Sequence, residues 1–158
     1  MPSPAALPTA LTRTPVPSAP VAGVVAFFET LTRANLPRLA TLYAPQARFV
    51  DPFNDVEGVP AITRIFEHMF DTLHDPRFVV TQVVEQGGQC FLTWEFHFRF
   101  RRFSPQQPQC IRGASHLVLD AQGLVSLHRD YWDAAQELYE KLPWVGGLVR
   151  WLRRQASR

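Results

Sequence analysis

Three polar residues in the C-terminal half of the chain have types and spacing that could move protons: Ser115, His128 and Asp130. His128 and Asp130 are two residues apart, so in a β-strand their side chains share one face. A carboxylate beside an imidazole can orient the ring, activate a water or protonate a leaving group. The same residues could instead form a hydrogen-bonded structural pair at the floor of a pocket, holding Tyr43 as well. The residue types alone leave both interpretations open.

Asp51 is a further candidate for acid–base chemistry, and it directly precedes Pro52. An apolar cup formed by Phe49, Trp94 and Phe96 would disfavour the charged carboxylate and suit Asp51 to act as a general base. The alternative is a turn aspartate, whose carboxylate accepts hydrogen bonds from nearby backbone N–H groups.

The elements that must position these residues are strands, and the clearest of them lies at 91–102. Its residues alternate strictly: Leu92, Trp94, Phe96, Phe98 and Phe100 between Thr93, Glu95, His97, Arg99 and Arg101. This alternation predicts a strand with one buried face. Turns at 104–108 and 120–123 predict that two more strands follow, at 111–119 and 124–132.

The turns also predict how these three strands pair. The expected pairs are Phe100–Ile111, Phe98–Gly113, Phe96–Ser115 and Trp94–Leu117, then Leu119–Leu124, Ser115–His128, Gly113–Asp130 and Ile111–Trp132. Glu95 is expected opposite His116 on the other face. This register turns Ser115, His128 and Asp130 toward the apolar face of the sheet.

Polar groups on a core face need partners, because each costs roughly 1–3 kcal/mol when it is buried unpaired. The three could bond to one another, or they could face a ligand or water in a cavity. Gly113 opposite Asp130 favours a cavity because it has no side chain there. The residues expected to line this pocket, or to pack as ordinary core, are Tyr43, Phe66, Phe70, Trp94, Phe96, Phe98 and Trp132. A ligand of such a pocket would be apolar and flat, or lipid-like.

The order of the remaining elements is helices first and strands later, which is typical of an α+β fold. Residues 1–20 are rich in proline and are expected to form a disordered arm. The domain proper is expected at 21–133. It begins with a helix that ends near Asn35, a second helix from Pro37, a strand at 47–51, a helix that opens at Gly58 and a strand at 78–85.

The C-terminal extension, 134–158, is amphipathic and basic. It is expected to continue a helix that runs from Asp133 to about Leu142. Packing over the pocket mouth or against a neighbouring subunit is one expectation for it. Peripheral contact with an anionic membrane surface through 144–158 is the other, because tryptophan with arginine suits that interface.

Composition limits the class of protein. The chain has 158 residues, 46% of them hydrophobic and 19% charged, which indicates one globular domain. A net charge of +2 gives no reason to expect nucleic acid as a partner. Cys90 and Cys110 are expected to be free thiols, which favours a reducing compartment. With no long apolar stretch and no secretory pattern, the cytoplasm is the expected location.

Several segments resemble the nuclear transport factor 2-like superfamily, which includes ketosteroid isomerase and the SnoaL-type polyketide cyclases. They are Leu42–Ala44 with Ala47–Pro52, Gly58–Ile62, Leu117–Val125 and His128–Asp133. The resemblance covers roughly residues 21–133. It implies a curved antiparallel sheet wrapped around N-terminal helices, with a cone-shaped pocket inside.

In ketosteroid isomerase the general base is an aspartate directly before a proline, and Asp51 looks like that residue. The donors that stabilise the oxyanion differ. Phe27 or Phe28 stands where the enzyme has a tyrosine, and Ser115 where it has a protonated aspartate. Steroid isomerisation of that kind is therefore not expected.

The opposite face of the sheet carries the polar residues of the long strand together with Arg112 and His116. In the superfamily this face often forms a dimer, so a homodimer is expected. His97 and His116 point away from His128, so no metal site is expected, and no cofactor either.

The sequence thus predicts a SnoaL-like domain that binds an apolar or lipid-like small molecule, and it leaves open whether the domain is an enzyme. The first hypothesis is cofactor-independent acid–base chemistry of the isomerase, cyclase, dehydratase or hydrolase type, carried by Asp51, His128, Asp130 and Ser115. The alternative is a non-catalytic ligand-binding or interaction module.

Overall fold

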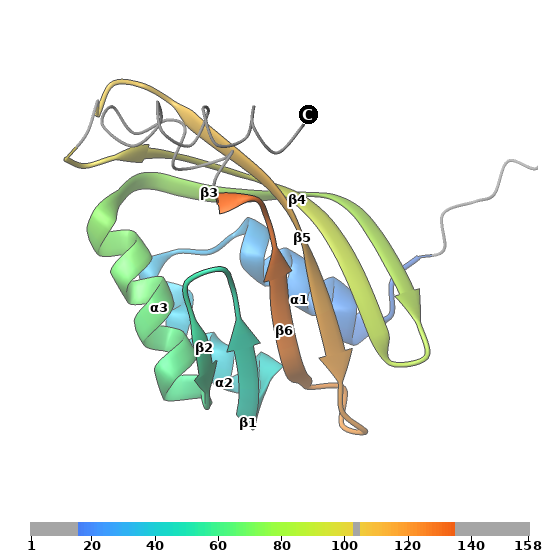
Figure 1. Cartoon of the computed structure of the whole chain (residues 1–158). Helices are drawn as coiled ribbons and strands as arrows, with labels where there is room; N and C mark the ends of the chain where they lie inside the picture. Colours follow the sequence, from blue (N-terminus) through green and yellow to red (C-terminus); the bar gives the residue numbers. More distant parts are fainter. Residues whose placement is uncertain (1–15, 103–104, 135–158) are drawn as a thin grey trace, which may run out of the picture.

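A computed structural model describes residues 16–102 and 105–134 of the chain and has the expected α+β architecture (Figure 1). Its elements are α1 (Ala19–Glu29), the 3₁₀ helix η1 (Arg33–Arg38), α2 (Leu39–Leu42), β1 (Tyr43–Val50), β2 (Asp55–Glu57), α3 (Val59–Thr72), β3 (Leu73–Gln86), β4 (Gln89–Phe100), β5 (Gln109–Leu119) and β6 (Val125–Tyr131). The strands form one curved sheet in the order β2-β1-β6-β5-β4-β3. Neighbouring strands are antiparallel except β1 and β6, which are parallel.

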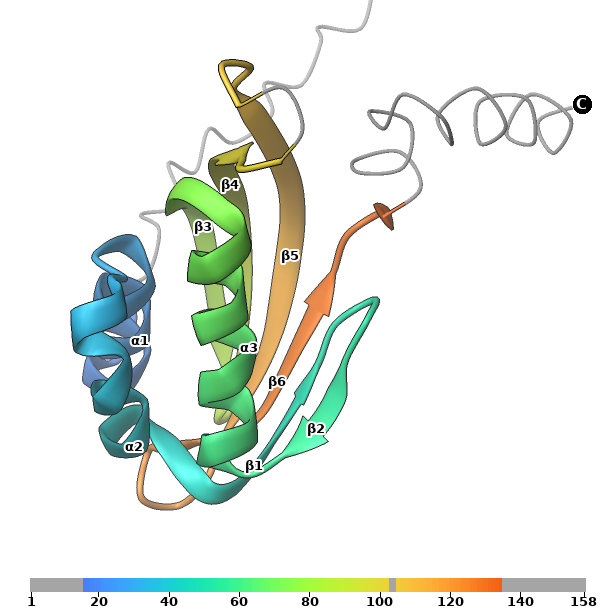
Figure 2. The ribbon, with the colours of Figure 1, turned by 90° about the vertical axis from the view of Figure 1, so that its left-hand side faces the viewer.

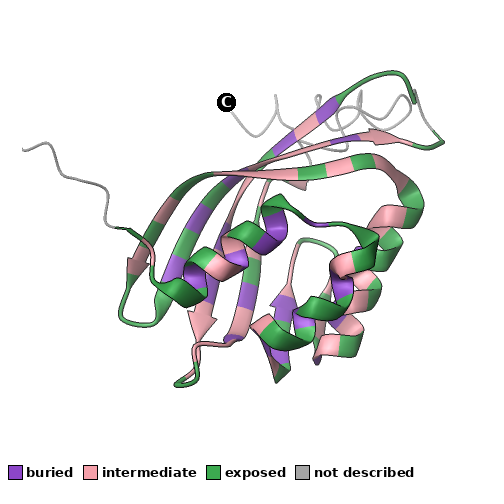
Figure 3. Ribbon diagram, turned by 180° about the vertical axis from the view of Figure 1, so that it is seen from behind, coloured by how far each residue is buried: buried purple, intermediate pink, exposed green. Residues whose placement is uncertain are grey.

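The helices lie together on one face of the sheet, and no described helix covers the other face (Figure 2). The residues that the helices turn toward the sheet are buried, and those on their far sides are exposed (Figure 3). The apolar core therefore lies in the concave side of the sheet. On α1 this buried stripe consists of Val21, Val24, Phe27 and Phe28.

The helix α1 is shorter than the apolar pattern predicts. It begins at Ala19, with Pro20 in its first turn, and ends at Glu29 rather than near Asn35. Asn35 belongs to a capping box that starts η1: its Oδ1 accepts from the Thr32 backbone N–H at 2.9 Å, and the Thr32 hydroxyl accepts from the Asn35 N–H at 3.3 Å. Asn35 thus opens a second helical turn, while its Nδ2 also donates to the carbonyl of Thr30, the residue directly after α1, at 2.8 Å.

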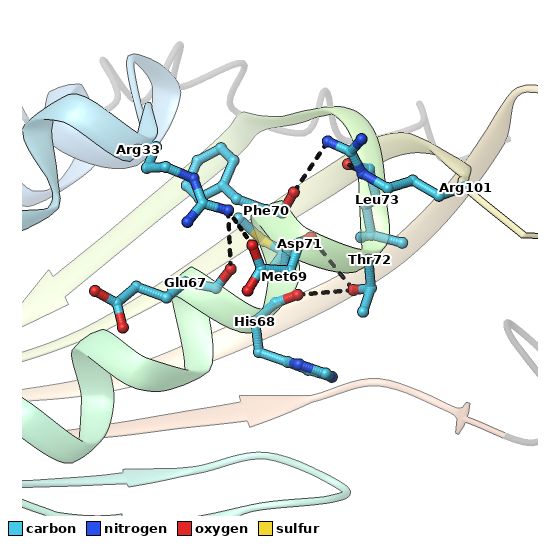
Figure 4. A network of polar contacts seen from close by, with 9 residues as sticks. All are labelled: Arg33, Glu67, His68, Met69, Phe70, Asp71, Thr72, Leu73 and Arg101. Atoms are coloured by element: carbon cyan, nitrogen blue, oxygen red, sulfur yellow. Dashed lines mark hydrogen bonds and ion pairs between the residues drawn. The ribbon is translucent and has the colours of Figure 1, made fainter.

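The helix α3 is anchored at both ends. Gly58, at φ 90°, provides the turn before it, and Pro60 occupies its first turn. At the C-terminus, Arg33 bonds to the Asp71 carboxylate at 2.5 Å, while Arg101 donates to the carbonyls of Phe70 at 3.2 Å and Leu73 at 3.1 Å (Figure 4). Two guanidinium groups thereby satisfy carbonyl and carboxylate oxygens that the helix end leaves exposed.

The strand β4 confirms the predicted alternation. Cys90, Leu92, Trp94 and Phe98 are buried, while Phe91 and Thr93 between them are exposed. The turn at Gly87–Gly88 is also present, and both glycines have positive φ.

The predicted strand register is wrong, although the predicted faces are right. Ile111 pairs with Phe96 and not Phe100, a slip of four residues, and Ser115 pairs with Leu92. Between β5 and β6, Ser115 pairs with Asp130 and Leu117 with His128, a slip of two. Both slips are even, so each residue stays on its expected face. Their cause is loop geometry: the β4–β5 connection starts earlier, and a bulge interrupts pairing between Val118 and Leu119.

Two consequences of the register differ from expectation. Glu95 lies opposite Arg112, whose Nε donates to Oε1 at 3.0 Å, while His116 stacks on Phe91 with ring centroids 4.5 Å apart. Gly113 lies opposite Trp94 and not Asp130. A Cβ on Gly113 would come within 2.5 Å of Trp94 Cζ2, so the missing side chain makes room for an indole rather than for a ligand.

Cys90 and Cys110 are both free of disulfides, as expected. Within the described part of the chain, no helix has the length and apolar character needed to cross a membrane. From residue 135 on, the predicted helix from Asp133 to about Leu142 and the basic extension lie outside the described residues, as do residues 1–15 of the arm. The predicted boundary of the arm at residue 20 is wrong, because Ala19 and Pro20 already belong to α1.

Candidate functional site

A continuous hydrogen-bonded chain of five side chains lies on the concave face of the sheet. Tyr43 Oη is 2.6 Å from His128 Nδ1, and His128 Nε2 is 2.8 Å from Asp130 Oδ1. The Ser115 hydroxyl donates to the same Asp130 oxygen at 2.5 Å, and Trp94 Nε1 donates to Ser115 Oγ at 2.8 Å. The three polar residues predicted to converge do so.

Four strands bring this chain together. His128 and Asp130 are on β6, Ser115 is on β5 directly opposite Asp130, and Trp94 is on β4. Tyr43 begins β1, which pairs in parallel with β6. Because these strands are adjacent and central in the sheet, their side chains are fixed relative to one another.

The direction of each hydrogen bond follows from the states of Tyr43 and Asp130. This residue is only 1% exposed, and burial, together with the nearby charge of Asp130, raises its pKa well above the ordinary value of 10.0. The Asp130 carboxylate only accepts hydrogen bonds, so His128 Nε2 donates to it, and the protonated Tyr43 hydroxyl donates to Nδ1. Every donor in the chain thus leads, directly or through Ser115 or His128, to one carboxylate oxygen.

The second oxygen of Asp130 has a different environment. Within the described residues, no group donates a hydrogen bond to Oδ2, and no buried side-chain oxygen is left without a partner, so Oδ2 retains accessible surface. The side chain of Asp130 is 17% exposed and that of His128 only 5%. Asp130 is therefore the member of the network that an incoming molecule could reach.

A small cavity of about 30 Å³ is lined in part by Asp130. Its walls are mostly apolar, and the lining residues are Phe28, Phe66, Phe78, Val80, Leu92, Trp94, Ser115, His128 and Asp130. A cavity needs about 10–15 Å³ of such space to hold one water molecule, whereas pockets for drug-sized ligands span about 300–1,000 Å³. The cavity thus has room for a water or one small substituent.

Asp51 is not part of this network. Its Oδ1 accepts from the backbone N–H groups of Phe53 and Asn54, each at 2.7 Å, and the Asn54 amide reaches both carboxylate oxygens at 3.0 Å. Among the described residues, no hydrogen bond joins Asp51 to His128 or Asp130. These contacts are those of a turn aspartate, and they leave its predicted role as a base without structural support.

Of the aromatic residues predicted to line a pocket, Phe66 and Trp94 line the cavity, and Tyr43 contacts it only through His128. Phe96 and Phe98 stack on each other with ring centroids 5.0 Å apart. Trp132 packs edge-on against Phe53, and Phe70 lies beneath the Arg33 guanidinium. For these four, ordinary packing accounts for the observed contacts.

Sequence reasoning missed four of the apolar lining residues, although each carried a usable pattern. Phe28 belongs to the predicted apolar stripe of α1, and Leu92 shares the buried face of β4 with Trp94. Phe78 and Val80 alternate at the start of the strand predicted at 78–85. Period-two alternation identifies the face of each residue but not its depth along the strand, and depth decides which residues reach the cavity.

The match to a family model settles the relationship. The model of the SnoaL-like domain matches residues 24–128, more than half of the chain. The chain belongs to the SnoaL-like family. Among curated proteins, none matches it.

Solved structures with the SnoaL-like fold are similar in shape but distant in sequence. A ketosteroid isomerase-like protein from Catenulispora acidiphila, in complex with trimethylamine, has a TM-score of 0.67 and 16% identity over 78% of this chain and 92% of its own. A putative SnoaL-like polyketide cyclase from Jannaschia sp. has a TM-score of 0.65 and 19% sequence identity, over 78% of this chain and 92% of its own. TsrD from Streptomyces laurentii has a TM-score of 0.65 and 15% sequence identity, over 82% of this chain and 98% of its own. At these identities the likeness concerns the fold alone.

This SnoaL-like domain has no free donor for an oxyanion among the described residues of its cavity. Phe28 contributes a ring without a donor. The Ser115 hydroxyl is committed to Asp130, and the Trp94 N–H to Ser115. The network therefore presents an acceptor, the Asp130 carboxylate, to the cavity and no hydrogen-bond donor.

Proposed function

We propose that this SnoaL-like domain binds a small, largely apolar molecule under its sheet and removes a proton from it, or from a water, with Asp130 as the base. The observation that carries the proposal is the asymmetry of the Asp130 carboxylate. Its Oδ1 accepts from Ser115 and His128, while Oδ2 accepts from no described group, and Asp130 itself lines the apolar cavity. A base needs one oriented oxygen that can accept a proton, and this arrangement supplies it.

In this mechanism the other polar residues position Asp130. Ser115 and the His128 Nε2–H hold Oδ1, and Tyr43 keeps the imidazole in the Nε2–H tautomer. The proton passes from the substrate or water to Asp130 Oδ2. The apolar walls exclude bulk water, which strengthens the interaction between the carboxylate and the group that loses the proton.

The hydrogen-bond donors of the network already have partners, and this limits the kinds of reaction that the site could catalyse. Reactions that build a localised oxyanion need a free donor to stabilise it, and each donor in the described network is already bonded. Activation of a water, which the cavity volume of about 30 Å³ would admit, needs only the acceptor. Among the expected types, hydrolysis and elimination therefore fit better than isomerisation through an enolate.

A second candidate function is ligand binding without chemistry. It is favoured by the mutual satisfaction of the five side chains, since a network with all its buried groups paired also stabilises a fold by itself. The two candidates differ in one respect, which is whether Asp130 accepts a proton from a bound molecule.

The base-catalysed ring opening of 5-nitrobenzisoxazole separates them. This flat, apolar compound is larger than the cavity of about 30 Å³, so the test requires only that the edge carrying its acidic C–H reach Asp130. The reaction needs a base, and its product spreads the negative charge over a nitrophenolate. We expect the full chain to accelerate the reaction above buffer, and Asp130→Asn to lower that acceleration by at least about a hundredfold, the lower range for general base catalysis.

Asp51→Asn is the matched control. Asparagine keeps an oxygen that can accept the turn hydrogen bonds, so the folded state and the rate should both be preserved. Equal rates for wild type and Asp130→Asn would reject Asp130 as the base. No acceleration by wild type, with saturable binding of the same compound, would favour the non-catalytic candidate.

A further inference from the structure

A second cluster of reactive side chains lies on the opposite face of the sheet, away from the cavity. Glu95, His97 and Cys110 each offer one ligand atom, and these atoms all lie within 4.8 Å of one another. Glu95 and His97 are two residues apart on β4 and so share one face, and Cys110 on β5 lies directly opposite His97. None of the three belongs to the Asp130 network.

The spacing within this cluster suits a metal ion. Glu95 Oε2 and His97 Nε2 are 3.1 Å apart. Two ligand atoms in a tetrahedral site with bonds of about 2.0–2.1 Å are separated by roughly 3.3 Å, so an ion could replace the proton between them with little movement. The Cys110 sulfur, within 4.8 Å of the other two ligand atoms, supplies the third ligand.

The chemistry of the three donors is selective. A thiolate, an imidazole and a carboxylate are ligands of zinc and of its borderline-soft neighbours, whereas magnesium and calcium prefer oxygen alone. Two anionic ligands would balance the two charges of the ion. Three protein ligands would leave a fourth position, and the partial exposure of His97 (35%) and Glu95 (30%) allows water to reach it.

Arg112 is the main argument against an ion here, because it places a positive charge on Glu95. However, its Nε bonds to Oε1 at 3.0 Å, while the oxygen directed at His97 is Oε2. One carboxylate can hold both, and ligating carboxylates in metal sites are commonly hydrogen-bonded through their other oxygen. Arg112 would then orient the ligand without competing for the ligating atom.

We propose that Glu95, His97 and Cys110 form a binding site for Zn²⁺ or a similar divalent transition metal ion on the outer face of the sheet. The pairing of β4 with β5 holds all three ligands on rigid, adjacent strands. The sequence alone did not indicate this cluster, because the predicted strand register did not place Cys110 opposite His97.

Cobalt spectroscopy tests this site directly. The full chain, without an affinity tag and under a non-thiol reductant, would be titrated with Co²⁺. We expect one ion per chain, with visible bands typical of four-coordinate cobalt and a near-ultraviolet sulfur-to-cobalt charge-transfer band, all removed by added Zn²⁺. Absence of the charge-transfer band would overturn the proposal.

Variants assign the ligands. Cys110→Ser should abolish the charge-transfer band, and His97→Ala and Glu95→Gln should each weaken binding by at least about tenfold. His116→Ala, on the same face but outside the cluster, should bind as the wild type does. Circular dichroism confirms that each variant is folded, and Glu95→Gln changes only a charge. A band that persists in Cys110→Ser, or unchanged affinity in both other variants, would refute the site.

Discussion

Asp130, which lines the cavity, receives two hydrogen bonds on one carboxylate oxygen and none from the described residues on the other. Behind it, His128 is held by a tyrosine whose hydroxyl is fully buried. His128 therefore has a partner at each ring nitrogen: Tyr43 at Nδ1 and Asp130 at Nε2. The arrangement explains how a mostly apolar core tolerates a tyrosine, a histidine and a serine that are nearly inaccessible to solvent.

At this residue scale, Tyr43→Phe should destabilise the protein by about 1–3 kcal/mol at neutral pH, because His128 Nδ1 loses its donor in a buried position. The pKa of Tyr43 is raised in the folded state above its ordinary value of 10.0. The stability that depends on its protonation is therefore complete below pH 10 and is lost as pH rises toward the folded-state pKa.

Tyr43→Phe lacks this titration, so the difference in the free energy of unfolding between the two proteins should shrink above pH 10. Urea unfolding of both proteins at neutral and alkaline pH measures it. The Cys90 thiol, whose pKa burial raises to about 11, titrates in both proteins and cancels in the comparison. Parallel loss of stability in wild type and variant would contradict the assigned role of Tyr43.

At the scale of elements, the contact between β4 and β5 determines where the cavity ends. The Trp94 indole lies over Gly113 and reaches Ser115 with its N–H. The space left by the glycine is thus filled by a neighbouring strand, and the network gains a donor. A strand glycine that faces an aromatic residue in this way couples the packing of two strands to the geometry of the site.

Gly113→Ala should therefore destabilise the domain by about 1–3 kcal/mol, the usual cost of overpacking, because the indole must move. The control is the same substitution in a Trp94→Phe background, where the smaller ring leaves room for a methyl group. The cost should fall there, and a double-mutant cycle of unfolding free energies measures the difference. An equal cost in both backgrounds would show that the indole is not the obstacle.

At the scale of the whole molecule, the two faces of the sheet differ in what covers them. The concave face packs on the helices, while the outer face has no described helix over it (Figure 2). On that outer face Phe91 remains 50% exposed and Tyr131 51% exposed. Phe91 stacks on His116, and Arg129 lies over the Tyr131 ring. Aromatic residues and arginine are enriched at protein–protein interfaces relative to the rest of the surface.

We expect this face to join two copies of the chain as a homodimer. Phe91→Glu places a charge at the centre of that contact and should shift sedimentation toward the monomer, while circular dichroism remains that of the wild type. Glu57→Gln, at the exposed edge strand β2, is the control and should leave the dimer intact. A monomeric wild type at micromolar concentration would contradict the expectation.

The proposed metal site lies on the same outer face, so metal binding and association could influence each other. Sedimentation with and without Zn²⁺ would measure this coupling, which must be reciprocal if both ligands bind the same state. The Asp130 cavity opens on the other side of the sheet, and its chemistry can be tested independently of both.

The sequence by itself determined the fold class, the family and the face on which each strand residue lies. Alternation and helical spacing are local properties of neighbouring residues, and they survive a change of strand register by an even number of positions. For this reason Ser115, His128 and Asp130 were placed correctly on one face although both predicted registers were wrong.

Only the tertiary structure decided which residues touch. Tyr43 meets His128 across 85 residues of sequence, through a parallel pairing of β1 with β6 that no local pattern indicates. The same holds for the Trp94 indole on Gly113 and for Cys110 beside His97. Contacts between strands depend on loop lengths, bulges and the closing of the sheet over its helices, and these are set by the packing of the whole chain rather than by any segment of it.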